Sequence, residues 1–449
     1  MRTTQRSERK GHIVFGRRKT VRTSAEVITL LTSGRMFKNG NAIEPVLDST
    51  NSENVLLLFR NGTESTIGPR IVCDGETYVA GRIDPTILRA VTLPTRIAPY
   101  GTARKLLTGI AELIIKYTTI SENSAAAVSR WALSTWFPEI LPAPGLSLVG
   151  SETSAGGQLM QLLHSFCRYP VLLTDVNAAG LRALPSEWNF TLLIVQPELP
   201  VGLQRLLSCA RRGIGFVPRG GRLLDFHCAV ATYTETSGVH GSGILPGVEI
   251  PVLSASQRLP VLDSAMRQQI ANNFQPKLLS YRLENFSKVL NSTVYLPELT
   301  PSMQGLAKSL SACTPEDPDL QAQVPDFLRT QDNELRSAAW LDLNVVLIEA
   351  ILAYVHEAKE HSVYVAEIAK AAEVILNARG ENRRLEPRAI GPRLGALGLM
   401  TEPRDRNGIR LILSGEVSRR VHELARSFSV PLNQDIVKRC ILCKSCSEG

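Results

Sequence analysis

The sequence contains no run of the roughly 18 to 20 apolar residues that a membrane-spanning helix requires. Its arginine-rich beginning also lacks the apolar segment of a secretory signal peptide. Repeats and low-complexity tracts are missing too, and 44% hydrophobic with 20% charged residues is typical of a globular protein. We therefore expect a cytoplasmic protein of roughly three domains without a membrane partner.

Regularly spaced cysteines are also scarce. Five of the eight are isolated along the chain, at positions 73, 167, 209, 228 and 313. This scatter argues against a disulfide framework and indicates small buried side chains in a reducing compartment.

Excess positive charge is nearly absent beyond the first 25 residues. Residues 1–25 hold eight lysines and arginines against Glu8 alone, so most of the formal charge of +8 lies there. A basic arm of this kind either adds salt-dependent affinity for nucleic acid phosphates or is a solvated, disordered terminus. The sequence leaves both interpretations open.

After this arm, the spacing of apolar residues changes several times along the chain. Residues 26–140 begin with short apolar segments between turn signals, which predict strands, and continue with helical spacing. In residues 141–255, apolar strands predicted at 146–150, 170–176, 191–199 and 225–234 alternate with helices at 157–166 and 201–212. This alternation predicts an α/β fold with a parallel sheet covered on both faces. Residues 256–340 are predicted to form a helical lid.

The first predicted strand of this core leads into a glycine-rich turn and then a helix. Gly150, Ser151, Ser154 and Gly156 provide a turn whose backbone N–H groups can surround an anion at the helix N-terminus. A phosphate-binding loop would continue with lysine and then serine or threonine, but Gly157 and Gln158 follow here.

The order and spacing of these segments resemble a diverged P-loop ATPase of the AAA+ or helicase type. The nearest similarity is to helicase/primase-like ATPases of plasmids, phages and integrated elements, in which a winged helix often follows. The resemblance implies that Gln196 stands where an acidic metal ligand is expected, with Glu198 nearby. It also implies a sensor role for Tyr233 or Thr234 and a nucleotide-contacting lid arginine at Arg282.

Loss of the lysine, hydroxyl and aspartate predicts impaired hydrolysis, because each lost electrostatic contact of this kind costs roughly 3 to 4 kcal/mol. Two outcomes stay open for the turn: it binds ATP without hydrolysing it, or it has no ligand. Three arginines lie in the predicted helix 201–212. They are either trans-acting arginine fingers in a homo-oligomer or part of an exposed helix face: Arg205, Arg211 and Arg212.

Residues 341–430 predict three helices and a hairpin around Asn407-Gly408, an order that resembles a winged helix-turn-helix. In a DNA complex, Arg388 and Arg393 are candidate groove contacts. The candidate phosphate contacts lie in the hairpin and are Arg404, Arg406 and Arg410. The alternative is a winged helix that contacts protein, since neighbouring carboxylates weaken the positive field.

The tail, residues 431–449, places Cys440, Cys443 and Cys446 in C-x2-C-x2-C spacing. Such spacing is found in zinc and iron–sulfur sites, but a fourth ligand would have to come from a distant residue or another chain. A tail with oxidation-prone thiols is the alternative. His356, His361 and His422 are expected to be polar-face helix residues rather than ligands.

Together these features predict a DNA-associated, catalytically impaired helicase-like protein, from a mobile element, that contacts double-stranded DNA through its winged helix. Two alternatives remain. One is an active motor completed by residues of a partner subunit, and the other is a regulator or adaptor that binds no nucleotide.

Overall fold

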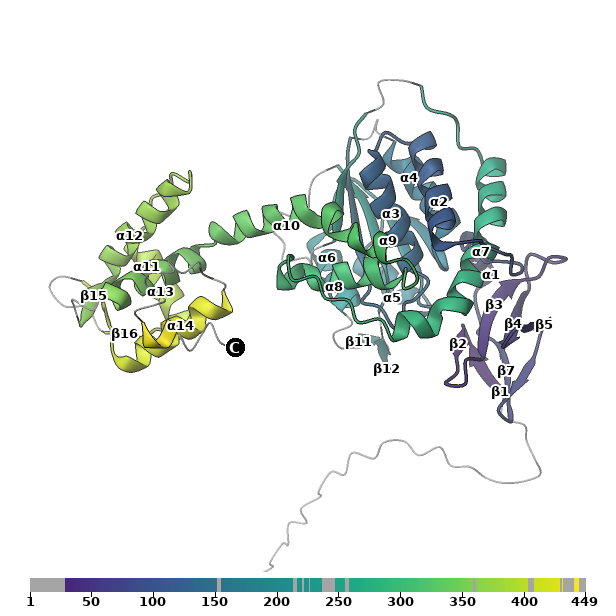
Figure 1. Cartoon of the computed structure of the whole chain (residues 1–449), viewed down its shortest axis with the longest axis horizontal. Helices are drawn as coiled ribbons and strands as arrows, with labels where there is room; N and C mark the ends of the chain where they lie inside the picture. The colour runs from purple at the N-terminus through teal and green to yellow at the C-terminus, as the bar shows by residue number, and fades with distance from the viewer. Residues whose placement is uncertain are drawn as a thin grey trace, which may run out of the picture. The chain divides into compact units, whose positions relative to one another are not determined.

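A computed structural model describes residues 29–151, 155–212, 216–219, 222–225, 227–235, 247–254, 258–357, 361–402, 408–428, 430 and 440–443. The chain divides into two compact units (Figure 1). The first contains the described residues up to Thr293 together with Ala312–Pro318, and the second contains Val294–Ser311 and the described residues from Asp319 onward. Across the part of the chain that is described, no helix is both long and apolar enough to cross a membrane.

The first unit begins with two small sheets, in which all neighbouring strands are antiparallel except β1 and β7. One has the order β2-β3-β4-β5 and the other β1-β7-β6. Their strands are β1 (Thr29–Thr32), β2 (Arg35–Met36), β3 (Ala42–Leu47), β4 (Val55–Asn61), β5 (Glu64–Gly68), β6 (Ile71–Cys73) and β7 (Glu76–Ala80). Ile43, Leu57 and Tyr78 form part of the core between them.

Three helices follow: α1 (Pro85–Ala90), α2 (Ala103–Tyr117) and α3 (Glu122–Ser134). The side chains of Thr102 and Ser121 accept hydrogen bonds from backbone N–H groups of the first turns of α2 and α3, and so fix where these two helices start. Trp131 and Trp136 are fully buried, as expected for packing residues rather than a binding surface.

The predicted parallel sheet is confirmed. It has five strands in the order β14-β8-β13-β10-β9, and every neighbouring pair is parallel. The strands are β8 (Gly145–Val149), β9 (Pro170–Thr174), β10 (Thr191–Val195), β13 (Val230–Thr234) and β14 (Val248–Pro251). The sequence pattern missed β14. It also predicted one strand over 225–234, where the structure has the end of a hairpin and then β13.

Helices cover both faces of this sheet, which explains why its strands are almost continuously apolar. On one face, leucines of α5 and α6 pack with Leu192 and Ile194 of β10. On the other, α4 packs against α7, α2 and the strands. The remaining elements of the unit are α4 (Gly156–Phe166), α5 (Ala178–Ala183), the 3-10 turn η1 (Ser186–Trp188), α6 (Val201–Arg212), β11 (Phe216–Arg219), β12 (Arg222–Asp225) and α7 (Ser264–Leu290).

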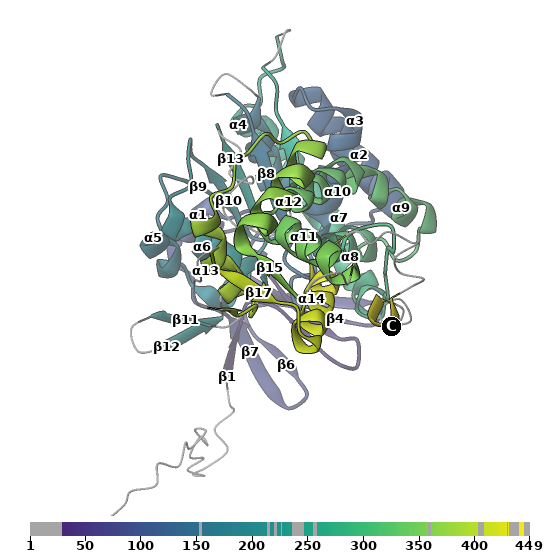
Figure 2. The same ribbon diagram turned by 90° about the vertical axis from the view of Figure 1, so that its left-hand side faces the viewer.

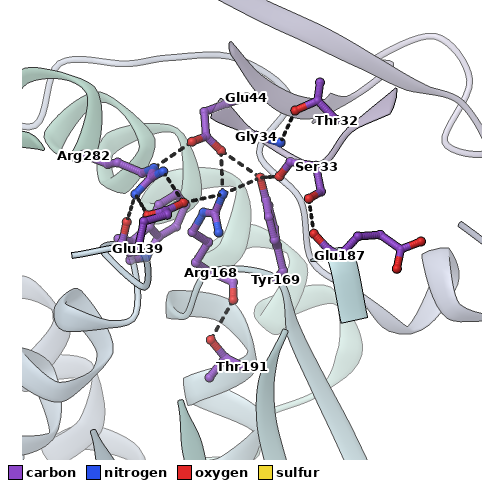
Figure 3. A network of polar contacts seen from close by, with 11 residues as sticks. Thr32, Ser33, Gly34, Glu44, Glu139, Arg168, Tyr169, Glu187, Thr191 and Arg282 are labelled. Carbon is purple, nitrogen blue, oxygen red and sulfur yellow. Dashed lines mark hydrogen bonds and ion pairs between the residues drawn. The ribbon is translucent and has the colours of Figure 1, made fainter. Parts of the chain in front are cut away.

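A buried ion-pair network joins the small sheets to the core at the amino ends of the parallel strands (Figure 3). Glu44 of β3 accepts hydrogen bonds from Arg168 at 3.1 Å, from Arg282 at 2.7 Å and from the Tyr169 hydroxyl at 2.8 Å. Arg282 also pairs with Glu139 at 2.8 Å. Burial by itself would raise the pKa of Glu44, but the two arginine charges outweigh burial and lower it from the usual 4.5 to about 2.

Gly34 makes this network sterically possible. Its φ is +121°, and a Cβ at this position would lie 2.8 Å from a terminal nitrogen of Arg168. Glycine is therefore required both for the backbone conformation and for the approach of the arginine.

The second unit contains the helices that follow the core. They are α8 (Pro301–Ala312, whose last residue belongs to the first unit), α9 (Pro318–Ala322), α10 (Val324–Trp340), α11 (Leu343–Glu357), α12 (Val365–Ala378), α13 (Pro387–Ala396) and α14 (Gly415–Ser427). Three short strands, β15 (Ser362–Tyr364), β16 (Thr401–Glu402) and β17 (Arg410–Ile412), form an antiparallel sheet in the order β15-β17-β16. Figure 2 labels β15 and β17 of this sheet. One apolar cluster, which includes Ile348, Ile368, Leu394 and Leu411, joins α11 to α14. The predicted single lid over 256–340 is thus divided, because α7 packs on α4 in the first unit.

We predict that Glu44→Gln, which keeps the shape but removes the charge, lowers the free energy of unfolding of the first unit by about 3 to 5 kcal/mol at pH 7. Two buried arginines would lose their shared carboxylate. Because the pKa of Glu44 is depressed, its stabilisation is present above pH 4.5 and is lost as the pH falls toward 2. The difference in free energy of unfolding between wild type and variant should therefore decrease as the pH falls from 4.5 toward 2. Urea denaturation followed by fluorescence of the buried Trp131, Trp136 and Trp188 measures it.

Glu316→Gln is the matched control, since its ion pair with Lys288 is about half-exposed. We expect this change to cost less than about 1 kcal/mol. Equal costs for the two variants, or a difference that does not change with pH, would contradict the assignment.

Candidate functional site

The glycine-rich turn has the strand–turn–helix arrangement that the sequence predicts. Strand β8 ends at Val149, and the backbone N–H of Gly150 donates to the carbonyl of Thr234 at 3.0 Å. Helix α4 begins at Gly156 without a side-chain cap. Gly150, Ser151, Gly156, Gly157 and Gln158 therefore lie at one edge of the sheet, whereas Ser154 lies outside the described residues.

Tyr233, the last residue but one of β13, connects the two ends of this turn. Its hydroxyl donates to the carbonyl of Ser151 at 2.5 Å. Its ring lies against Gly156, where a Cβ would be closer than 3.0 Å to three ring atoms. The ring therefore contacts both the residue that enters the turn and the residue that leaves it.

The position expected for the metal-binding aspartate has a structural role in this protein. Gln196 directly follows β10, and its side-chain oxygen accepts a hydrogen bond from the backbone N–H of Val176 at 2.9 Å. Its side-chain nitrogen donates to the carbonyl of Glu198 at 2.8 Å. Gln196 thus fixes the loops that follow β9 and β10, and the nearby Glu198 is exposed.

The segment that forms the turn contributes no basic side chain. The sequence has no lysine or arginine between Gly145 and Phe166. A Cβ on Gly157, at the position of the missing lysine, would meet no atom within 4 Å. Gln158 donates a hydrogen bond of 3.4 Å to the carbonyl of Pro260. Within this stretch, only backbone N–H groups and the helix dipole are available to neutralise an anion.

Arg282 does not lie with these residues, which corrects the expectation from sequence. It is fully buried and bonds to Glu44, Glu139 and the carbonyl of Trp136 (Figure 3). Its neighbour Arg168 lies two residues before the start of β9, so the network is at the amino edge of the parallel sheet. The glycine-rich turn is at the opposite, carboxyl edge. Arg282 therefore joins parts of the protein and is not available to a nucleotide at the turn.

The C-terminal arginines differ in their surroundings. Arg388 and Arg393 are exposed on α13, and among the described residues no side chain pairs with either. Arg410 is paired with Glu402 across the β16–β17 sheet at 2.7 Å. Arg404 and Arg406 lie outside the described residues.

Helix α13 has an outer face of small residues. Ile390 and Leu394 are buried against the core of the second unit. Gly391 and Gly395 face open space, since a Cβ on either would meet nothing within 4 Å. Sequence analysis missed Arg383 and Arg384, which are exposed in the loop that leads into α13. Their proximity in sequence to Arg388 could have indicated them as further candidate DNA contacts.

Cys440 and Cys443 lie beside two histidines. Their sulfur atoms are in contact with His422 and His356, respectively. His422 is buried, which corrects the expectation that it lies on a polar face, whereas His356 is half-buried. Cys446 lies outside the described residues. No spacing in the sequence signals a site whose ligands come from three separate segments.

The structure does not decide the predictions for the basic arm and for the three arginines of α6. The basic arm, residues 1–25, lies outside the described residues, and the side chains of Arg211 and Arg212 are not described. Arg205 is exposed on α6, which fits either a finger or a solvated face.

No protein-family model and no curated protein matches this chain. Among solved structures it is similar to the apo NrS-1 C-terminal region, with 11% identity, a TM-score of 0.38 and coverage of 83% of this chain and 97% of that one. It is also similar to SCCmec type IV Cch, described as an active helicase, at 12% identity, a TM-score of 0.40 and coverage of 81% and 79%. An MCM homologue from Methanopyrus kandleri gives 13% identity, a TM-score of 0.30 and coverage of 65% and 76%. Likenesses this distant assign no function to the chain.

We predict that Gly156→Ala destabilises the first unit by about 1 to 3 kcal/mol, because the new methyl group would overlap the Tyr233 ring. Gly157→Ala is the adjacent control and should be neutral or stabilising by up to about 1 kcal/mol, since it faces open space in the same helix. Urea denaturation followed by tryptophan fluorescence compares the two.

A double-mutant cycle isolates the contact. In a Tyr233→Ala background, Gly156→Ala should lose most of its cost, because the clashing ring is gone. Equal effects of the two glycine substitutions, or additive effects of Gly156→Ala and Tyr233→Ala, would show that the ring does not lie against Gly156.

Proposed function

We propose that the protein associates with double-stranded DNA through its C-terminal unit and that this unit is a winged helix. Helices α11, α12 and α13 are followed by the short hairpin β16–β17, and β15 pairs with β17. In a winged helix-turn-helix, the helix before the hairpin enters the major groove. That helix is α13 in this chain.

The exposed face of α13 is the observation that carries the proposal. Two glycines inside a helix cost roughly 1 kcal/mol each relative to alanine, and no atom near Gly391 or Gly395 requires them. Small side chains flanked by Arg388 and Arg393 would allow the helix to approach a surface closely and place guanidinium groups against guanine edges or phosphates. Arg388 also borders a pocket of about 290 Å³ with Gly408 and Ile409, which precede β17.

We further propose that the parallel-sheet core is a helicase- or AAA+-type ATPase fold of the kind carried by mobile elements, and that it does not turn over ATP. The absent lysine, hydroxyl and aspartate would each contribute roughly 3 to 4 kcal/mol to phosphoryl transfer. Gln196 and Tyr233 instead make contacts within the protein. The core would then serve as an assembly platform in a homo-oligomer, with DNA bound by α13.

Tyr233 favours a second candidate, a winged-helix regulator that binds no nucleotide. A phosphate enclosed between Ser151 and Gly156 would compete with the ring that contacts both residues. The two candidates share the DNA-binding helix and differ in whether ATP binds to the core.

We predict that Arg388→Ala combined with Arg393→Ala weakens duplex DNA binding at least tenfold, because each arginine contact with a base or phosphate contributes about 1 to 3 kcal/mol. The slope of log affinity against log salt should also become shallower by up to about 2, through loss of two phosphate neutralisations. Fluorescence anisotropy of a labelled duplex over a range of salt concentrations measures both quantities.

Arg419→Ala is the matched control, since Arg419 is exposed in the same unit but on α14. Its removal should leave the affinity within about twofold of wild type. The assignment of α13 as the DNA-contacting helix fails if the double variant binds like wild type, or if the control weakens binding as much.

A further inference from the structure

Two imidazoles and two thiols meet at one point in the second unit. His356 is near the end of α11, His422 is in the middle of α14, and Cys440 and Cys443 are near the C-terminus of the chain. The two histidine Nε2 atoms are 3.2 Å apart. Cys440 Sγ lies 3.3 Å from Nε2 of His422, and Cys443 Sγ lies 3.2 Å from Nε2 of His356.

We infer that these four side chains bind one zinc ion in a closed tetrahedral site. Ligand atoms at the usual Zn–N and Zn–S lengths of about 2.0 and 2.3 Å are separated along the edges of the tetrahedron by roughly 3.3 to 3.8 Å. The separations of 3.2 and 3.3 Å lie at or slightly below the short end of that range, and all four ligand atoms lie within 4.8 Å of one another. One central cation accounts for all of these contacts.

The orientation of His422 provides independent support. Its Nδ1 lies 2.7 Å from the carbonyl oxygen of Ser418. A carbonyl only accepts hydrogen bonds, so Nδ1 carries the proton and Nε2 presents its lone pair to the cluster. A hydrogen bond from the outer ring nitrogen to a backbone carbonyl is the arrangement that orients zinc-bound histidines. The ring is 4% exposed, and the groups that face its Nε2 lone pair are a thiol and a second imidazole, both of which are zinc ligands.

The ligand pairing favours a single ion over an iron–sulfur cluster. In two-iron clusters with two histidine and two cysteine ligands, the histidines bind one iron and the cysteines the other. Here each sulfur lies next to an imidazole nitrogen, and the two nitrogens also touch each other. Two cysteines and two histidines around one centre are the ligand set of a structural zinc site with no open position for substrate.

The ion would hold the end of the chain on the second unit. Helices α11 and α14 already pack together through the apolar cluster of this unit. Within the segment Cys440–Cys443, Ile441 is exposed and Cys443 is buried, and metal coordination would attach the segment to α11 and α14. Removing the ion should therefore release this segment and lower the stability of the DNA-binding unit, because metal binding to such sites is coupled to folding.

Metal content of the full-length protein, purified without a histidine tag and without chelators, tests the inference. Elemental analysis by plasma mass spectrometry should give one zinc per chain. After removal of zinc, titration with Co²⁺ should produce the visible absorption of a tetrahedral cobalt ion and the near-ultraviolet charge transfer of thiolate ligands, saturating at one equivalent. A pocket of about 520 Å³ borders His356 and Cys440 and should give chelators access.

Ligand variants separate this site from a three-cysteine site. Cys443→Ser and His356→Asn should each lower zinc affinity by about 100-fold or more, a larger effect than the loss of an outer-sphere contact. Cys446→Ser is the matched control and should keep one zinc per chain with unchanged cobalt absorption. His361→Asn is a second control, since His361 is exposed and outside the cluster.

Two results would overturn the inference. One is wild-type protein that contains no zinc and shows no tetrahedral cobalt absorption, a result that does not depend on how any variant folds. The other is Cys446→Ser losing zinc as completely as Cys443→Ser. Because DNA affinity is not measured in this experiment, failure of the zinc site and failure of the proposed DNA contact are distinguishable.

Discussion

Two arginines without appreciable solvent exposure, Arg168 and Arg282, share the carboxylate of Glu44 at the amino edge of the parallel sheet. This sharing joins β3 of the small sheets, the start of β9 and the middle of α7. A charge removed from water in this way is tolerated only while its partners remain, so the three segments are constrained together. The position of the core relative to its N-terminal sheets depends on that constraint.

The opposite edge of the sheet is organised by neutral groups. Gln196 holds two loops through its amide, and Tyr233 connects the ends of the glycine-rich turn. Both positions are at strand ends, where a parallel sheet gathers the side chains of its ligand site. The side chains of Gln196 and Tyr233 at this edge therefore make contacts within the protein.

Sequence predicted the parts of the molecule that follow from local pattern. Continuous apolar strands between helices indicated the parallel sheet, but β14 was missed because four residues around Glu249 show no clear period. Arg282 was assigned to a nucleotide from the resemblance of its segment to an arginine-bearing lid, and such a resemblance does not show which partner a side chain meets. Glu44 is a single carboxylate in an apolar strand, and nothing in the local sequence predicts that it pairs with two arginines. The cysteine spacing indicated Cys440 and Cys443 of the His/Cys cluster. It could not indicate His356 and His422, because these lie on helices that are distant in sequence.

Thermal melting of the purified full-length protein with and without millimolar ATP and Mg²⁺, paired with phosphate release, tests most directly whether the core has lost its ATP chemistry. Our account predicts phosphate release at the buffer background. An unchanged midpoint, which the contact of Tyr233 with both ends of the turn favours, would select the regulator that binds no nucleotide, and a raised midpoint without turnover would select the core that binds ATP. Binding with the ligand at 100 times its dissociation constant would instead add about 2.7 kcal/mol of stability and raise the midpoint. A raised midpoint with turnover that disappears on Gly156→Asp would contradict the account.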